Sequence, residues 1–532
     1  MDTRAPTGGP DGVHAAPPIP TPLVELVLDD GSDVSAGEGE LRWRRLPPGE
    51  TTPTAATPRD APTGWRATAG DVVPLAPTDG DGRWLAGVGR GDTPADWRAL
   101  GAAAVRAARA ALAAGETDDG TSGDPAGPLS LFVRPDTEAD APGDADDPDE
   151  EGAPGDDATG AADAWAALAT GVVLGSHRLS LRSRPRADVG RVRLPVPPRH
   201  RDAVARAVVL ARATALARDL ADTPAGLKSP AWFADRAVAA LGPVAGLEVT
   251  VHDEQWLAEN RFGGVLAVGG GSARPPRLLE ISWAPADAAG DHVVLVGKGI
   301  TFDTGGISIK PTASMVDMRT DCSGGAAVVA TMRALGELGV PRRVTGLVPL
   351  AENHVSGSAY RPGDVVRHRD GTTSEVTNTD AEGRMVLADA LGHAVELLAP
   401  DLVVDVATLT GAAKSALGVR TGAVFATSPE LARRILDAGG RVGESWWPLP
   451  LAAAHEEAVS STIADVRQAP TGPGAITAAL FLRRFTGGLP WAHLDIAGPA
   501  RCDAAHEEVA RGATGFAART LVELCAADRP GA

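Results

Sequence analysis

The segment from Asn378 to Arg384, with the sequence NTDAEGR, combines side chains that could carry out acid–base or metal chemistry. Its two carboxylates, Asp380 and Glu382, lie two residues apart, and an amide and a guanidinium flank them. An apolar run that predicts a helix, 385–398, follows directly. Acids beside an arginine at a helix start can also form an N-terminal cap with an ion pair, because carboxylates are favoured there. The heptapeptide alone leaves both interpretations open.

A second group of ionisable residues follows a predicted buried strand at 292–296, where the chain enters a glycine-rich turn. In open α/β sheets the carboxyl ends of strands are where ligands bind. A lysine inside such a turn is costly to bury unless it is paired or deprotonated. This second group consists of Lys298, Asp303, Lys310 and Asp321, with Asp317 as a further acid nearby.

Together, the two groups place more charge at the edges of apolar strands and helices than a core tolerates without a compensating centre. Two divalent cations could compensate, since carboxylates can bridge metals about 3.5–4 Å apart and a neutral lysine amine can be a ligand. A buried ion-pair network is the alternative. The histidines that precede acid pairs, His455 and His506, have no second histidine four residues on. They therefore form no zincin helix, and we interpret both as exposed charges.

The N-terminal part of the chain predicts a small α/β domain at residues 1–190. Its expected elements are strands at 23–28 and 129–133 and helices at 95–114 and 164–175, with irregular structure elsewhere before residue 80. Residues 136–157 contain eleven acids and no base, which predicts a solvated, low-complexity acidic insertion near 134–160. A basic connector containing prolines, 182–200, is predicted to mark the domain boundary.

Residues 191–532 predict a larger domain in which strands and helices alternate, the pattern of a sheet with helices on both faces. The expected strands are 247–251, 277–283, 292–296, 343–350 and 402–406, and the expected helices are 202–220, 231–241, 324–338, 385–398, 430–438 and 475–485.

Composition limits the class of protein. The formal charge is −19, with 69 acids and 50 bases, which argues against general affinity for nucleic acid or anionic membranes. The three cysteines, Cys322, Cys502 and Cys525, lack metal-knuckle spacing and favour a reducing compartment. No signal peptide and no run of 18 apolar residues is recognisable. We therefore expect a soluble cytoplasmic protein.

With these residues assembled, the chain resembles the leucyl aminopeptidase family, also called cytosol aminopeptidases or peptidase family M17. NTDAEGR at 378–384 is similar to the family signature, and VGKGITFDTGGISIK at 296–310 is nearly as specific. Further matching stretches are AVGGGSARPPRL at 267–278, YRPGDVV at 360–366, ATLTGA at 407–412 and WAHLDIAGPA at 491–500. The likeness covers 200–527 firmly and is looser before that.

The resemblance implies a macro-like N-terminal α/β domain and a C-terminal α/β catalytic domain with a mixed sheet flanked by helices. It also implies two divalent metal ions per subunit, Mn or Zn. One ion would be bound by Lys298, Asp303, Asp321 and Glu382, and the other by Asp303, Asp380 and Glu382. Lys310 and Arg384 would be the catalytic residues that bind no metal, with bicarbonate at Arg384 as the general base. The ions would activate a bridging water and polarise the scissile carbonyl.

The implied activity is release of the N-terminal residue, preferably leucine or another apolar residue, from peptides by a homohexamer. Positions matching the family's first-residue pocket are Met318, Asn378, Thr408, Leu409 and Gly411. Some relatives bind DNA as recombination accessory proteins or transcriptional regulators, which is the alternative function. A catalytically dead scaffold is a third possibility, but it conflicts with the complete set of ligand positions.

Overall fold

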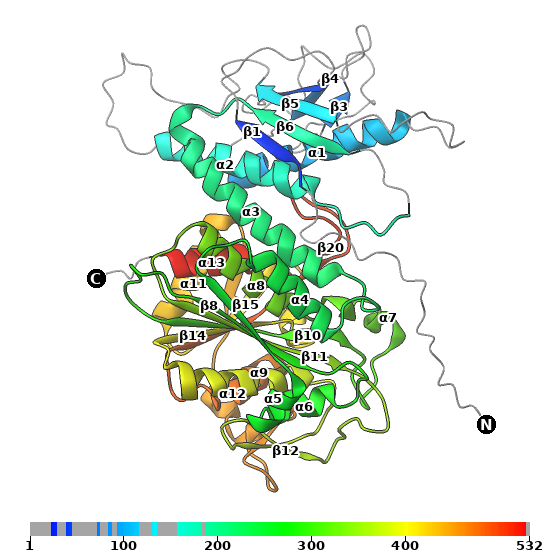
Figure 1. Ribbon diagram of the computed structural model, residues 1–532, viewed down its shortest axis with the longest axis vertical. Helices are drawn as coiled ribbons and strands as arrows, with labels where there is room; N and C mark the ends of the chain where they lie inside the picture. The colour runs from blue at the N-terminus through cyan, green and yellow to red at the C-terminus, as the bar shows by residue number, and fades with distance from the viewer. Residues whose placement is uncertain are drawn as a thin grey trace, which may run out of the picture.

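The computed structural model describes residues 23–28, 39–44, 72–74, 83–87, 93–115, 129–135, 157–183 and 188–527. Two α/β units are visible in it, a smaller N-terminal one and a larger one built on a long sheet (Figure 1). The long helix α3 (Arg201–Asp222) runs from the first unit to the second and packs on helices of both. This arrangement agrees with the predicted α/β class.

The N-terminal unit contains a six-stranded sheet in the order β1-β6-β5-β2-β4-β3. Its strands are β1 (Glu25–Leu28), β2 (Gly39–Arg44), β3 (Val72–Pro74), β4 (Arg83–Gly87), β5 (Leu129–Pro135) and β6 (Val189–Leu194). All neighbours are parallel except β3 and β4. Helices α1 (Pro94–Gly115) and α2 (Asp157–Ser176) pack closely together. Gly171 allows this close approach, because a Cβ at that position would lie 2.1 Å from the Arg98 carbonyl oxygen.

The N-terminal predictions need three corrections. The region before residue 80 contains β2 and β3 besides the predicted strand, so irregular structure was the wrong expectation there. The predicted connector 182–200 contains β6, which pairs with β1 and β5; its apolar alternation is short and interrupted by arginines. The two ends of the predicted insertion belong to β5 and α2, while residues 136–156 lie outside the described ranges. The division at residue 190 stays a prediction, but β6 crosses it.

The larger unit contains a nine-stranded mixed sheet in the order β16-β15-β18-β14-β9-β11-β8-β7, with β10 also paired to β11. Its four central strands, β18, β14, β9 and β11, are parallel to one another, whereas β15 and β8 join them antiparallel. The strands are β7 (Leu247–His252), β8 (Arg277–Trp283), β9 (Val293–Gly297), β10 (Gly299–Asp303), β11 (Val344–Asn353), β14 (Leu402–Ala407), β15 (Thr421–Ala426), β16 (Ser445–Pro448) and β18 (Trp491–Asp495).

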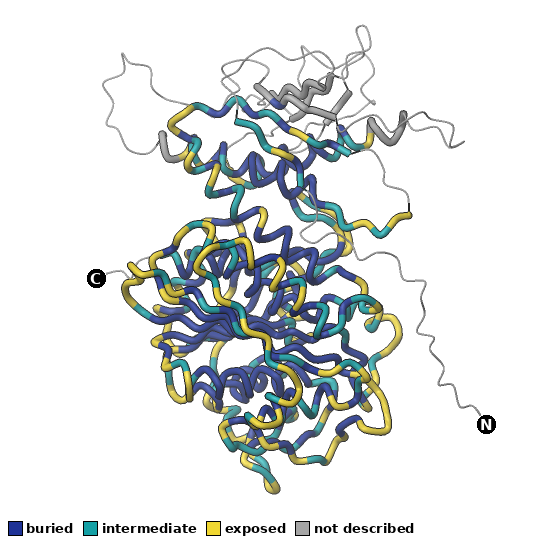
Figure 2. Tube along the Cα trace, in the orientation of Figure 1, coloured by how far each residue is buried: buried dark blue, intermediate teal, exposed yellow. Residues whose placement is uncertain are grey.

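Alternating residues of the central strands enter two cores, one on each face of the sheet. Figure 2 shows the central strands of this sheet as buried. On β9, Val293 and Leu295 belong to the first core, and Val294 and Val296 belong to the second. Helices on the first face are α3, α4 (Pro230–Leu241), α8 (Ser323–Glu337), α11 (Pro429–Val442) and α13 (Ala518–Ala526). Those on the second are α5 (Glu254–Glu259), α6 (Gly263–Gly269), α9 (Glu382–His393) and α12 (Gly474–Arg483).

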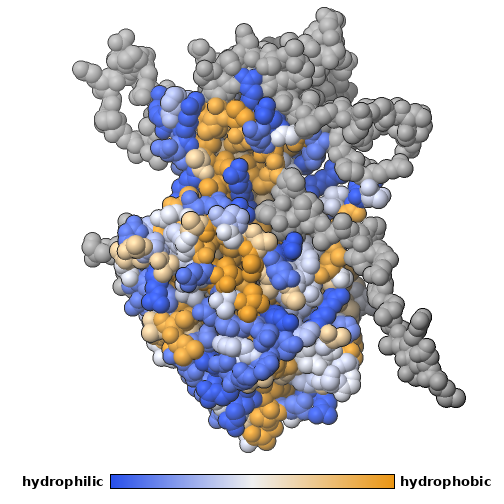
Figure 3. Space-filling model, viewed as in Figure 1, coloured by the Kyte–Doolittle hydropathy of each residue, from blue (hydrophilic) through white to orange (hydrophobic). Residues whose placement is uncertain are grey.

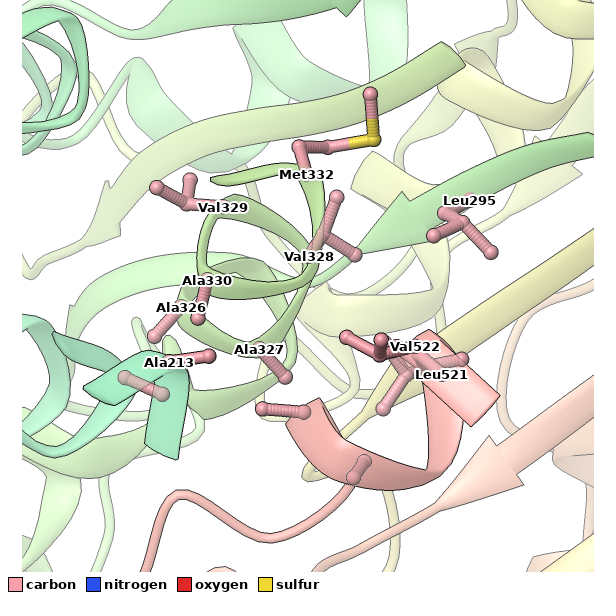
Figure 4. Close-up of a cluster of buried hydrophobic side chains, with 14 of the residues drawn as sticks. Ala213, Leu295, Ala326, Ala327, Val328, Val329, Ala330, Met332, Leu521 and Val522 are labelled. Carbon is pink, nitrogen blue, oxygen red and sulfur yellow. The ribbon is translucent and has the colours of Figure 1, made fainter. Parts of the chain in front are cut away.

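Figure 4 shows how α8 fills the first core. Small residues of α8, such as Ala326 and Ala330, let neighbouring helices approach, while Val328 and Met332 are fully buried. Leu521 and Val522 of α13 pack in the same cluster. This close packing fixes α8, whose first turn follows Asp321 directly.

The predicted strands and helices of this unit are confirmed, with shifted ends. The predicted helix 385–398 starts earlier, at Glu382, and its last residues form a π-helix, η4 (Ala394–Leu398). The elements that sequence reasoning missed include β10, β15, β16, β18, α5, α6 and α13. His493 and Asp495 of β18 are fully buried. Because these polar residues interrupt the apolar pattern, the sequence did not indicate a buried strand there. No described helix combines the length and apolar character needed to span a bilayer.

Candidate metal centre and catalytic cavity

The two predicted groups of charged residues meet at the carboxyl ends of the central strands. Lys298 lies between β9 and β10, and Asp303 is the last residue of β10. Asp321 follows the 3-10 turn η3 (Met318–Thr320), just before α8. Glu382 is the first residue of α9. Parallel strands and the helices after them thus bring together residues that are more than 80 positions apart in the chain.

Lys298 forms ion pairs with two carboxylates of the site, Asp321 and Glu382. Its Nζ is 2.9 Å from Asp321 Oδ1 and 2.7 Å from Glu382 Oε1, and it donates a hydrogen bond of 3.0 Å to the Thr408 carbonyl oxygen. Gly383 leaves the space for this side chain, since a Cβ there would lie 2.6 Å from Lys298 Cε. Burial opposes the charged form, but the neighbouring carboxylates outweigh it and raise the pKa of Lys298.

Asp303 is the carboxylate most firmly positioned by the backbone. Its Oδ1 accepts hydrogen bonds of 2.8 Å from the Gly305 amide and from Asn353 Nδ2. Its Oδ2 lies 2.8 Å from Nζ of Lys310, which also forms an ion pair with Asp380. Burial raises the pKa of Asp303, and the negative charge of Glu382 adds to the shift. The site is therefore built to hold carboxylates close together.

The donor set fits divalent cations. Asp303, Asp380 and Glu382 each offer a carboxylate oxygen, and these oxygens lie within 4.8 Å of one another. Among the described residues, Asp321 Oδ2 and Glu382 Oε2 are buried and accept no hydrogen bond. Such buried oxygens are costly without a partner. Hard carboxylate oxygens are the ligands that Mn²⁺ prefers, and Zn²⁺ also accepts them.

Arg384 follows Glu382 on α9 and faces the same cavity. Its Nη1 donates a hydrogen bond of 2.6 Å to the Gln468 carbonyl oxygen, whereas its Nε finds no partner among the described residues. Burial lowers the pKa of Arg384 to about 10, against the opposing effect of Glu382 and Asp495. The guanidinium remains charged at neutral pH, so it can hold an anion.

The alternative of a capped helix with a Glu382–Arg384 ion pair is wrong for this segment. The N-cap position of α9 is Ala381, which makes no side-chain cap, and Glu382 forms its ion pair with Lys298. Asn378 Oδ1 accepts a hydrogen bond of 2.9 Å from the Asp380 amide, which fixes the turn that presents Asp380.

A cavity of about 790 Å³ contains these groups. Every predicted site residue lines it except Asn378, which is exposed and supports the turn instead. The lining residues that had been predicted are Lys298, Asp303, Lys310, Met318, Asp321, Asp380, Glu382, Arg384, Thr408, Leu409 and Gly411. Thr408 Oγ1 donates a hydrogen bond of 2.7 Å to Asp321 Oδ1, so it orients an acid as well as lining the cavity.

Several residues of the site were missed by sequence reasoning. Asn353 donates a hydrogen bond to Asp303, and the carbonyl oxygen of Gln468 accepts one from Arg384. The one sequence feature that points to Asn353 is its place at the end of the apolar segment that forms β11. The stretch 501–506 lines the cavity. The interpretation of His506 and the two acids after it as exposed charges holds for Glu507, which is exposed. It was wrong for His506, which is half-buried and lines the cavity, and for Glu508, which is only 2% exposed.

Affinity for a divalent cation is expected to fall as the pH is lowered through about 6. Burial raises the pKa of Asp321 to about 6 in the metal-free protein, although the ammonium of Lys298 opposes this. Below that pH a cation must displace the proton of Asp321, and above it the carboxylate is already ionised. Calorimetric titrations with Mn²⁺ at pH 5, 6 and 7.5 measure the trend, and equal affinity at all three values would contradict it.

The family model and the curated relatives that match this chain are all described as cytosol aminopeptidases. The family described as "Cytosol aminopeptidase family, catalytic domain" matches residues 215–522. A probable cytosol aminopeptidase of Rhodococcus jostii is 45% identical over 373 residues, covering 67% of this chain and 73% of the relative. A relative from Desulfovibrio desulfuricans with the same description is 48% identical over 315 residues, covering 59% of this chain and 63% of its own.

Solved structures are similar over nearly the whole chain. The bottromycin maturation enzyme BotP in complex with Mn is 41% identical with a TM-score of 0.76, covering 92% of this chain and 99% of its own. A mutant of tomato leucine aminopeptidase is 28% identical with a TM-score of 0.78, covering 97% and 99%. The cytosol aminopeptidase of Coxiella burnetii is 28% identical with a TM-score of 0.72, covering 94% and 98%.

Proposed function

The chain belongs to the cytosol aminopeptidase family, and from that premise we propose that it is a metal-dependent aminopeptidase that removes the first residue of peptides. The observation that carries the proposal is the cavity itself. Four buried or half-buried carboxylates and two lysines converge there, and two carboxylate oxygens have no partner among the described residues. An ion-pair network alone would leave those oxygens unsatisfied, whereas divalent cations would satisfy them.

We assign two divalent ions, Mn or Zn, to this cavity. Lys298, Asp303, Asp321 and Glu382 would hold one ion, and Asp303, Asp380 and Glu382 would hold the other. When bound, such ions supply an activated water and polarise a carbonyl. Lys298 would act as a neutral amine, so binding has to release its proton. The Mn in the BotP structure supports the choice of metal.

Two residues of the chain would act directly on the substrate. The Lys310 ammonium lies beside Asp303 and Asp380, where it would stabilise the negative charge that develops on the carbonyl oxygen. Arg384 would hold bicarbonate through parallel hydrogen bonds, and the bicarbonate would serve as the general base. Gln468 holds the guanidinium by its carbonyl oxygen, so Arg384 is already oriented before an anion arrives.

The cavity lining supports the proposed preference for apolar first residues. Met318 and Leu409, with the small residues Thr408 and Gly411, would surround the first side chain of the peptide. These groups suit leucine and other apolar residues. Asn378 is exposed and would contribute by positioning Asp380.

A homohexamer in the cytoplasm is the assembly that the family membership favours. Figure 3 shows several separate apolar patches on one face of the molecule, on the N-terminal unit and on the larger unit, with polar surface between them. Apolar patches rimmed by polar residues are typical of interfaces between subunits. Nothing among the described residues favours the DNA-binding alternative over peptide hydrolysis.

The proposal predicts that purified protein supplied with Mn²⁺ or Zn²⁺ releases leucine from Leu-amide and from peptides with N-terminal leucine. Chelation followed by dialysis should reduce the rate to background, and adding the metal back should restore it, because the ions complete the site. A peptide acetylated at its N-terminus is the matched control and should not be cleaved. No release of leucine with either metal would overturn the proposal.

A further inference from the structure

One side of the cavity is a short segment, residues 501–506, which we call the cavity wall. It begins with β19 (Arg501–Cys502), which pairs with β20 (Gly512–Ala513). Cys502 Sγ lies 3.3 Å from His506 Nδ1 within the segment. At its end, the Val509 amide donates a hydrogen bond of 2.8 Å to the His506 carbonyl oxygen. The cavity wall contains no helix, and its other internal contacts join near neighbours, such as Cys502 Sγ with the Ala504 carbonyl oxygen and Arg501 with Asp503. Arg501 also pairs with Asp317 at 2.5 Å. The position of the cavity wall therefore depends on contacts with other segments.

The residues that follow the cavity wall are anchored by helix α1 of the N-terminal unit. Arg98 Nε lies 3.1 Å from Glu508 Oε1. Arg106 Nη2 donates a hydrogen bond of 2.7 Å to the Glu507 carbonyl oxygen. From the catalytic unit, Arg519 Nη2 lies 3.2 Å from the same Glu508 oxygen. Glu508 therefore joins the two units directly beside the cavity.

The Arg98–Glu508 contact is buried and specific. The exposed fractions of the two residues are 8% and 2%. Burial opposes the charge on Glu508, but Arg519 and Arg98 outweigh it and lower the pKa of Glu508 to about 2. Gly443 makes room for the guanidinium, because a Cβ there would lie 2.3 Å from Arg98 Nη2. Loss of one partner of such a buried pair leaves a charge poorly compensated.

We propose that Arg98 and Arg106 are positioning residues for peptide binding: through Glu507 and Glu508, the N-terminal unit holds the cavity wall in place. The two arginines lie outside the matched family region of 215–522 and are not among the residues that line the cavity. They act only through the segment that they anchor. The assignment of the cavity to peptides rests on the proposed function, whereas the mechanical link between α1 and the cavity wall does not.

The test uses the full-length metal-loaded protein and compares Arg98→Met, Arg98→Lys and Arg106→Met with wild type. Arg191→Ala is the matched control, because Arg191 pairs with Glu25 on the N-terminal sheet, away from the cavity. Hydrogen exchange measured by mass spectrometry reports the opening of residues 501–509 without any need for catalysis. Kinetics with Leu-amide and with a Leu-containing tripeptide then separate KM from kcat for short and longer substrates.

In Arg98→Met, we expect the amides of 501–509 to exchange roughly tenfold faster. The variant lacks the ion pair with Glu508, so less free energy is needed to open this segment locally. KM for the tripeptide should rise by about tenfold, while its kcat and the metal content stay near wild type and Leu-amide is affected less. Arg98→Lys should recover part of both effects, and Arg191→Ala should match wild type.

Wild-type exchange and wild-type KM in a folded Arg98→Met protein would overturn the proposal. If that variant does not fold, Arg106→Met decides by the same two measurements, since it removes only one exposed hydrogen bond. Faster exchange in the variants of a protein that cleaves no peptide would keep the link to the cavity wall and reject the proposed function instead.

Discussion

Asp303→Asn is expected to lose bound metal and to lower kcat/KM by about 1000-fold. This loss is larger than the roughly 10- to 100-fold expected for a residue that only hydrogen-bonds to a metal ligand. Asp303 would contribute to both metal positions, and its Oδ1 is held by the Gly305 amide and by Asn353. The amide that replaces it is a poorer ligand of nearly the same shape, so the fold should persist. Metal analysis after dialysis against Mn²⁺ and kinetics with Leu-amide measure both effects.

Asp317→Asn is the control for this prediction. Asp317 lines the same cavity but is paired with Arg501 at 2.5 Å and lies outside the carboxylate cluster. That variant should bind as much metal as wild type. An Asp303→Asn protein that retained all of its metal would show that Asp303 is not a metal ligand, contrary to the proposed assignment.

Lys310→Ala and Arg384→Ala are expected to keep their metal and lose turnover, with kcat lowered by roughly 10²–10³ in each, as for the loss of an oxyanion partner. Lys310 is an ammonium that competes with cations for Asp303 and Asp380, so its removal should not weaken metal binding. Arg384 touches Gln468 but no carboxylate of the cluster.

Metal content and kcat, each measured with and without added bicarbonate, test this division of roles. Wild-type activity should respond to bicarbonate, whereas that of Arg384→Ala should not. Lys414→Ala, which removes another lysine of the cavity lining, is the control and should retain the response. Loss of metal in either of the two main variants would mean that the substituted residue helps to bind metal, contrary to its proposed role.

Most of the candidate site could be predicted because its residues occur in two short segments with unusual composition. Lys298, Asp303 and Lys310 lie in one glycine-rich connection, and Asp380, Glu382 and Arg384 lie in one turn before a helix. Charged residues beside apolar strands are conspicuous, since a core does not tolerate them unpaired. Asn378 was placed differently from expectation because its local hydrogen bond to the Asp380 amide could not be seen in the pattern.

The parts that escaped prediction depend on contacts between distant segments. The cavity wall, 501–506, has no periodicity of its own. Its position depends on contacts with distant residues, namely Asp317, Arg519, and Arg98 and Arg106 about 400 positions earlier. Strand β6 is short and rich in arginine, so only its pairing with β1 and β5 identifies it. Local sequence contains little information about such pairings.

The central claim is that this cavity binds metal and releases the first residue of peptides, and digestion of a peptide library tests it most directly. Samples supplied with Mn²⁺, Zn²⁺ or Co²⁺ are compared with a metal-free sample, and products are identified by mass spectrometry. We predict loss of single N-terminal residues, with leucine and other apolar residues preferred, in metal-supplied samples only. Cleavage inside peptides, equal cleavage without metal, or no cleavage with any metal would contradict the account.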